Sequence, residues 1–90
     1  MSPAKLSNTL QAGFVRTELE TGHRMLAAAI GQRRAGQDAT AAQSLDLARL
    51  ALAGAERHLS AVSLPGGAAG ELEHWLEELR GRIHEFEAGR

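Results

Sequence analysis

The chain has 90 residues, no cysteine and a formal net charge of −1, which fits one small domain and excludes disulfides and thiolate metal sites. Its 10 basic and 11 acidic side chains nearly balance, so the composition argues against a nucleic-acid partner. Alanine (17 residues) and leucine (13) far outnumber valine and isoleucine (four together), a mixture that favours helix over sheet. We therefore expect a single all-α domain over residues 1–90.

Apolar runs in the chain are short. The longest, residues 25–30, falls far below the roughly 20 residues that a membrane helix needs. No apolar run of signal-peptide length follows the N-terminus. We expect a soluble, cytoplasmic protein without a membrane partner.

Turn-forming residues cluster at two places, 35–39 and 63–70, and divide the chain into three segments of helical period. These segments predict helices at residues 3–34, 40–62 and 70–88. Short connections between long helices favour an antiparallel order. The predicted fold is therefore a three-helix up-down-up bundle with a long antiparallel helical hairpin.

An apolar line runs along the first predicted helix in steps of four and three: Val15, Leu19, Gly22, Leu26 and Ala29. Pro3 suits the first helical position, and Gly36 supplies the left-handed residue that commonly ends a helix. Leu6, Leu10 and Phe14 form an earlier apolar patch that lies off this line. If the other helices are shorter, these three side chains have no obvious partner within the chain.

The second predicted helix opens with Thr40 and Gln43, which fit a capping box. A heptad line of small and large apolar residues follows: Ala41, Leu45, Ala48, Leu52, Ala55, Leu59 and Val62. Alanine on this line allows a neighbouring backbone to approach closely. A second apolar facet predicts that this helix lies between two neighbours. Its members are Leu47, Leu50, Gly54 and Ala61.

The third predicted helix carries an apolar line of its own: Leu72, Leu76, Leu79, Ile83 and Phe86, with Trp75 beside it. Across the chain, the 22 apolar residues larger than alanine provide a small core for three helices. A two-fold dimer would bury further apolar surface, so we predict a homo-oligomer, with a dimer favoured. The candidate interface residues are Leu6, Leu10, Phe14 and Trp75. The alternative for Trp75 is that it closes the edge of the bundle.

Two Glu-x-x-His pairs, Glu20–His23 and Glu71–His74, offer an alternative function. This spacing puts a carboxylate and an imidazole on one helical face, as in four-helix di-iron proteins. With Glu56 as a bridging ligand, the pairs could form a dimeric metal-binding helical bundle. However, these side chains flank the apolar lines and a fourth helix is missing. Ordinary surface ion pairing is the simpler interpretation, and we expect no bound metal or other cofactor.

The sequence lacks a cysteine nucleophile and a Gly-x-Ser-x-Gly elbow, so we predict no enzymatic activity. Three stretches, Phe14–Gly22, Ala48–Leu59 and Glu71–Leu79, resemble short bacterial helical proteins that are called tetratricopeptide-like and have no assigned function. The chain departs from that pattern in having no 34-residue repeat. The resemblance implies a helical hairpin plus a third helix used for protein association, and no catalytic residues. The predicted function is a non-enzymatic helical protein–protein interaction or oligomerisation module, and a peptide-binding half-module is the other possibility that the resemblance raises.

Overall fold

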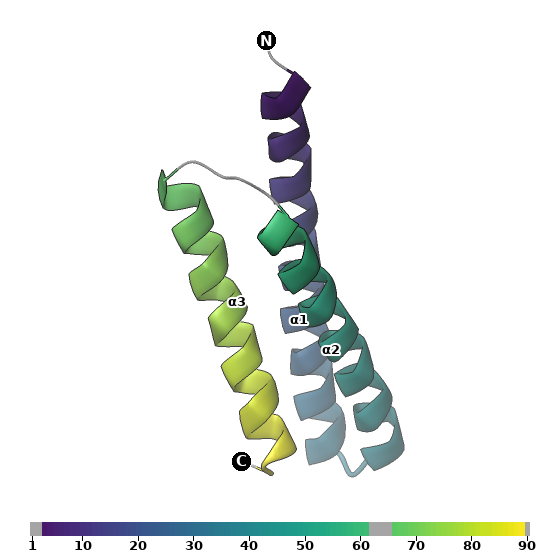
Figure 1. Ribbon diagram of the computed structural model, residues 1–90. Coiled ribbons are helices and arrows are strands. Elements are labelled where there is room, and N and C mark those ends of the chain that lie inside the picture. The colour runs from purple at the N-terminus through teal and green to yellow at the C-terminus, as the bar shows by residue number, and fades with distance from the viewer. Residues whose placement is uncertain (1–2, 62–65, 90) are drawn as a thin grey trace.

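The computed structural model describes the backbone of residues 3–61 and 66–89 and the side chains of residues 10–60 and 69–89. The described chain forms three helices, α1 (Pro3–Arg34), α2 (Asp38–Ala61) and α3 (Gly66–Glu87). It contains no strand within those ranges. Successive helices run in opposite directions (Figure 1). The predicted all-α, three-helix up-down-up fold is confirmed.

Gly36 ends α1 and reverses the chain within three residues. Its φ angle of +79° lies in the left-handed region, which glycine enters at little cost. The Gly36 N–H donates to the Arg33 carbonyl at 3.0 Å, and the Gln37 N–H donates to the Gln32 carbonyl at 2.8 Å. This pair of bonds is the Schellman ending of a helix, so the predicted role of Gly36 is confirmed.

α2 begins at Asp38, two residues before the predicted start. The chain is already helical after the turn, and the Ala41 N–H donates to the Gln37 carbonyl at 2.9 Å. The negative side chain of Asp38 lies in the first turn, where the helix dipole favours it. Thr40 therefore lies inside the helix, and the predicted capping box at that residue is wrong.

α3 begins at Gly66, four residues before the predicted start at Gly70. A glycine in a helix costs about 1 kcal/mol relative to alanine, a penalty that weakens a helix without ending it. Ala68 and Ala69 are the strongest helix formers and offset part of that cost. The stretch 66–69, predicted to be part of a connection, is the first part of α3.

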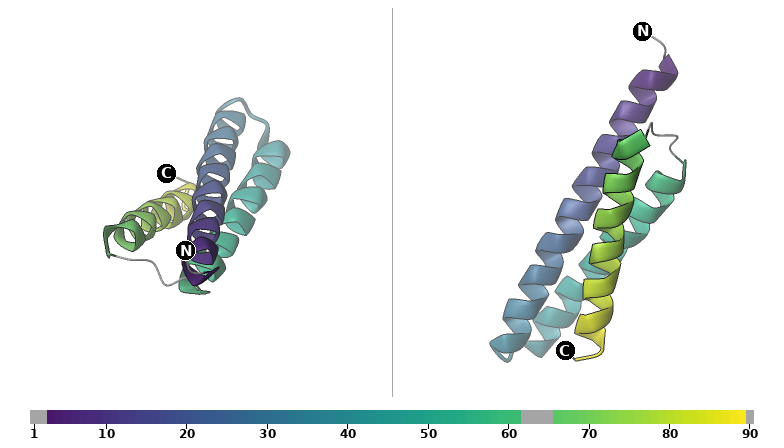
Figure 2. Two further views of the ribbon diagram at one scale, coloured as in Figure 1. Left: turned by 90° about the horizontal axis from the view of Figure 1, so that it is seen from above. Right: turned by 90° about the vertical axis from the view of Figure 1, so that its left-hand side faces the viewer.

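Buried small residues concentrate in the α1–α2 hairpin. They are Gly22 and Ala29 in α1, and Ala41, Ala48, Ala51, Gly54 and Ala55 in α2. Such residues let the two helix backbones lie close together, and α1 and α2 pack extensively against each other. α3 contacts both helices of the hairpin to a similar, smaller extent and covers one side of it (Figure 2). The second helix therefore has two neighbours, as predicted, but it is not the middle helix of the bundle, because α1 and α3 also contact each other.

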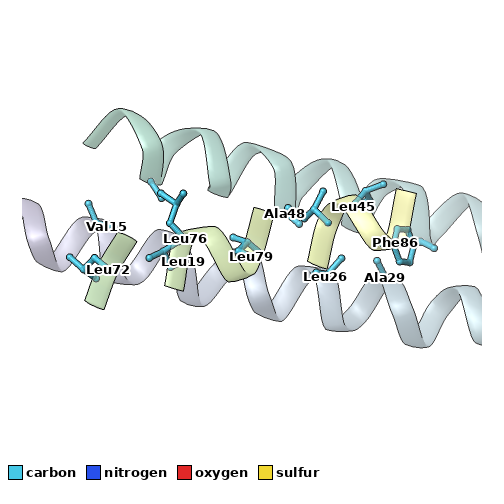
Figure 3. Close-up of a cluster of buried hydrophobic side chains, with 13 residues drawn as sticks. Val15, Leu19, Leu26, Ala29, Leu45, Ala48, Leu72, Leu76, Leu79 and Phe86 are labelled. Atoms are coloured by element: carbon cyan, nitrogen blue, oxygen red, sulfur yellow. The ribbon is translucent and has the colours of Figure 1, made fainter. Parts of the chain in front are cut away.

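Apolar side chains from all three helices meet where α3 covers the hairpin (Figure 3). The core consists of Val15, Leu19, Leu26 and Ala29 from α1, Ala41, Leu45, Ala48 and Ala55 from α2, and Leu72, Leu76, Leu79, Ile83 and Phe86 from α3. Leu52 and Leu59 are partly buried and pack against this core. The three predicted apolar lines thus form the core over the described side chains, and Val62 lies outside them.

Arg33 of α1 contacts the C-terminal end of α3. Its guanidinium carbon lies 3.7 Å from the centroid of the Phe86 ring, and its Nη1 donates to the Phe86 carbonyl at 2.8 Å. At the same end of the hairpin, the buried hydroxyl of Ser44 donates to Oε1 of Gln32 at 2.7 Å. These polar contacts satisfy groups that would be costly to bury alone.

Two arginines connect α2 and α3 at the surface. Arg49 of α2 pairs with Glu87 of α3, and Arg80 of α3 lies 3.4 Å from a carboxylate oxygen of Glu56 of α2. The hydrogen bond from Arg49 to Glu87 raises the pKa of the guanidinium above its ordinary value. Both pairs are about half exposed, so each contributes little to stability.

The molecule is elongated, with extents of 52 × 18 × 15 Å. Its radius of gyration is 14.8 Å, whereas a compact chain of this length has a radius of about 12 Å. The N-terminal turns of α1 extend beyond the ends of α2 and α3 (Figure 1). A long, thin bundle of this kind keeps much of its helix surface in contact with solvent.

Candidate protein-interaction face

Four large apolar side chains are exposed among the described residues. Their exposed fractions are 59% for Leu10, 60% for Phe14, 50% for Leu47 and 68% for Leu50. The first two lie on α1 and were expected to lack a partner within the chain, whereas the leucines at 47 and 50 belong to the facet of α2 that was expected to be buried. Leu6, the third residue of the predicted α1 patch, lies outside the described side chains.

The exposed leucines of α2 lie on the side of the hairpin that faces away from α3. Leu50 follows the fully buried Ala48 by two residues, about 200° around the helix. Leu47 and Leu50 help to form a groove between α1 and α2. The groove is lined by Glu18, Thr21 and Met25 of α1 and by Leu47, Leu50, Ala51 and Arg57 of α2.

Phe14 and Leu10 continue this surface toward the N-terminal end of α1. Leu10, Phe14 and Glu18 follow one another at intervals of four residues and so share one side of the helix. The Phe14 ring stacks on the imidazole of His58 in α2, with centroids 6.1 Å apart and an angle of 24° between the planes. We call the exposed residues Leu10, Phe14, Leu47 and Leu50, together with the groove lining, the hairpin face.

Gly54 sits beneath this surface, where a side chain of α1 contacts the backbone of α2. The carboxylate of Glu18 occupies the space that a Cβ atom on Gly54 would need. Because glycine leaves this space open, an α1 side chain can lie directly on the backbone of α2. Gly54, predicted as part of an apolar facet, therefore serves the packing between α1 and α2.

Trp75 belongs to the packing of α3 on α1, away from the hairpin face. It is partly buried, packs against the core and stacks on the imidazole of His23. The ring centroids are 5.5 Å apart and the planes differ by 13°. Of the two interpretations of Trp75, this position fits the residue that closes the edge of the bundle.

His23 has no lone pair available for a metal ion. Nη1 of Arg82 lies 2.9 Å from Nδ1 of His23, and a guanidinium only donates hydrogen bonds, so Nδ1 is the acceptor. The ring proton is then on Nε2, which is buried without a hydrogen-bond partner among the described residues. His23 therefore serves the docking of α3 in this conformation.

The other candidate metal ligands lie at the surface. Glu20, Glu71 and His74 are exposed, and Glu56 pairs with Arg80. In the described part of the chain, no three carboxylate or imidazole groups lie close enough to hold one ion. The structure does not bring the two Glu-x-x-His pairs together within one chain, so this alternative requires ligands from a second chain.

Sequence reasoning missed Leu47 and Leu50 as candidate interface residues, although it found the facet to which they belong. The sequence pattern identifies an apolar facet on the second helix. It does not show whether that facet packs against the same chain or against a partner. Two apolar facets on the second helix match a chain with two other helices, so the pattern alone gave no sign that one facet is exposed.

Comparisons with known proteins assign neither a family nor a function to the chain. The chain matches no protein-family model, no curated protein and no solved structure. Within the described residues, no helix is long and apolar enough to cross a membrane.

Proposed function

We propose that this chain is a non-enzymatic helical module that associates with a second copy of itself through the hairpin face. The observation that carries the proposal is the exposure of Leu47 and Leu50 in the middle of a well-packed helix. Large apolar side chains gathered on one surface, with a groove between them, are typical of protein interaction sites. The same face includes Leu10 and Phe14 of α1.

The total exposed surface supports the proposal. The chain exposes 5765 Å², whereas folded monomers of 9.6 kDa expose about 5100 Å². The difference of about 700 Å² reflects the elongated shape of the chain. An elongated chain has room for an interface of standard size, to which each partner contributes ~800 Å².

A double substitution tests the proposal. Leu47→Ser/Leu50→Ser removes the two exposed leucines of α2 and leaves the buried core unchanged. We expect the unmodified chain to sediment as a dimer at micromolar concentrations and the double variant to sediment as a monomer. The apolar contact that these leucines would make is lost, and burial of the exposed half to two thirds of each leucine contributes on the order of 1–2 kcal/mol.

A matched control separates this effect from helix propensity. Ala27→Ser/Ala42→Ser makes two substitutions by serine at exposed positions outside the hairpin face. This control should remain dimeric, and circular dichroism should show the same helix content for all three proteins. A double leucine variant that dimerises as tightly as the unmodified chain contradicts the proposal.

A further inference from the structure

Four residues form a stripe along the outer side of α2. Their charges and sizes allow the stripe to pair with the same stripe on a second copy of the chain. Asp46, Leu50, Ala53 and Arg57 follow one another in steps of four, three and four, so they lie along one side of the helix. All four residues are exposed. In chain order they are an acid, a large apolar residue, a small residue and a base.

The spacing of this stripe reads the same in both directions. When a second α2 lies antiparallel across it, with a two-fold axis between Leu50 and Ala53, Asp46 of each copy meets Arg57 of the other. Each Leu50 then meets the small Ala53, which leaves room for the larger side chain. Two-fold interfaces require this reciprocity, because every contact of residue i with residue j is repeated as j with i.

A parallel arrangement of two α2 helices loses this complementarity. In a parallel pair, the two copies of Asp46 would lie side by side, as would the two copies of Arg57, and like charges directly opposed are unfavourable. The Asp46 carboxylate already lies 3.1 Å from Arg49 of its own helix, but 70% of its side chain is exposed, so it is accessible to a second chain. Leu47 flanks the stripe on the side toward α1 and adds apolar contact there.

We infer that the hairpin face is occupied by a second copy of this chain, packed antiparallel through α2, with two Asp46–Arg57 pairs flanking two Leu50–Ala53 contacts. The inference rests on the proposed function and adds the partner's orientation and register. It predicts which charges meet across the interface, and that prediction is testable without a structure of the dimer.

Charge-reversed variants test the register. In a dimer of Asp46→Arg, each introduced arginine faces Arg57 of the other copy. In a dimer of Arg57→Asp, each introduced aspartate faces Asp46 of the other copy, so either variant alone repels itself at two symmetric positions. We expect the dimer dissociation constant of each single variant to rise by about tenfold at low salt.

Combining the two changes should restore the dimer. An equimolar mixture of Asp46→Arg and Arg57→Asp brings opposite charges together at both positions, so heterodimers form with an affinity near that of the unmodified chain. The double variant Asp46→Arg/Arg57→Asp exchanges the acid and the base within one chain and should likewise recover as a homodimer.

Two controls match the charge changes outside the stripe. Arg24→Asp on α1 and Glu85→Arg on α3 alter exposed residues, and we expect neither to change the dissociation constant by more than about twofold. Sedimentation equilibrium at low and high salt measures all the constants, and circular dichroism confirms that each variant is folded. The effect of the stripe variants should shrink at high salt because surface charges are screened.

The outcomes distinguish the register from the proposed function. If the single variants and their mixture dimerise as the unmodified chain does while Leu47→Ser/Leu50→Ser is monomeric, self-association stands and the antiparallel register is wrong. If the unmodified chain is itself monomeric, the proposed function fails and the register fails with it. If each single variant dimerises more weakly and the equimolar mixture dimerises as the unmodified chain does, the results support both self-association and the antiparallel register.

Discussion

A methyl carbon of Leu79 lies 2.5 Å from the position that a Cβ atom on Gly22 would occupy, and the Ala51 Cβ lies 3.5 Å from the same position. Gly22 is thus a point where all three helices come close together, with Leu79 of α3 filling the space above the α1 backbone. Leu79 is fully buried, so its side chain has little room to move aside. The absence of a side chain at Gly22 therefore allows Leu79 to pack closely against α1.

Gly22→Ala should destabilise the protein. A methyl group at this position forces Leu79 outward, and overpacking of this kind costs about 1–3 kcal/mol. The substitution also gains up to about 1 kcal/mol of helix propensity, so the net loss should be up to about 2 kcal/mol. Chemical denaturation followed by circular dichroism measures it.

Gly31→Ala is the matched control in the same helix. A Cβ atom there meets nothing within 4 Å, so only the propensity gain remains. We expect this variant to be more stable than the unmodified chain by up to about 1 kcal/mol. Equal and positive effects at both glycines would show that Leu79 does not pack on Gly22 as described.

Ala48→Leu should separate α2 from its neighbours. Ala48 is fully buried on the apolar line of α2, and a leucine in its place must displace core side chains. We expect a loss of about 1–3 kcal/mol in the free energy of unfolding. The same change at exposed Ala42 should alter the melting temperature little. An Ala48→Leu variant that melts no lower than the unmodified chain would rule out the close alanine seam.

The stack of Trp75 on His23 should couple α3 to α1 energetically. A double-mutant cycle with His23→Ala and Trp75→Ala isolates the pair, and we expect a coupling energy of about 0.5–1.5 kcal/mol. Trp75 is the sole tryptophan, so its fluorescence reports the same contact. A coupling energy of zero would mean that the rings do not touch in solution.

The surface ion pairs between α2 and α3 should matter little. Arg49→Gln and Arg80→Gln each remove a half-exposed pair between α2 and α3, together with an exposed pair to Asp46 or Glu77 in the same helix. We expect each substitution to cost roughly 0.2–1 kcal/mol. The cost should fall as salt is added, because exposed charges are screened. A loss of several kcal/mol in either variant would contradict the view that these exposed pairs contribute little to stability.

The fold could be predicted from the sequence because local signals agreed with the packing. The apolar lines through Leu19, Ala48 and Leu79 marked the core-facing side of each helix, and Gly36 marked the end of α1. The boundaries were less well predicted. The stretch 66–70 has the composition of a linker yet is helical, and Thr40 resembles a cap yet lies inside α2.

The candidate site could be predicted only in part. Leu10 and Phe14 stood apart from the apolar line of α1, and they are exposed. Leu47 and Leu50 were misplaced because an apolar facet has the same pattern whether it is buried by the same chain or left free. The role of His23 could not be predicted either, since its contacts with Trp75 and Arg82 join residues more than 50 positions apart.

The most direct test of self-association is the absolute mass of the unmodified chain in solution, measured by size-exclusion chromatography with light scattering over a dilution series. The proposed function predicts a mass of twice 9.6 kDa at high concentration that falls toward 9.6 kDa on dilution. A mass of 9.6 kDa at every concentration would contradict it and would leave the hairpin face exposed in the isolated protein.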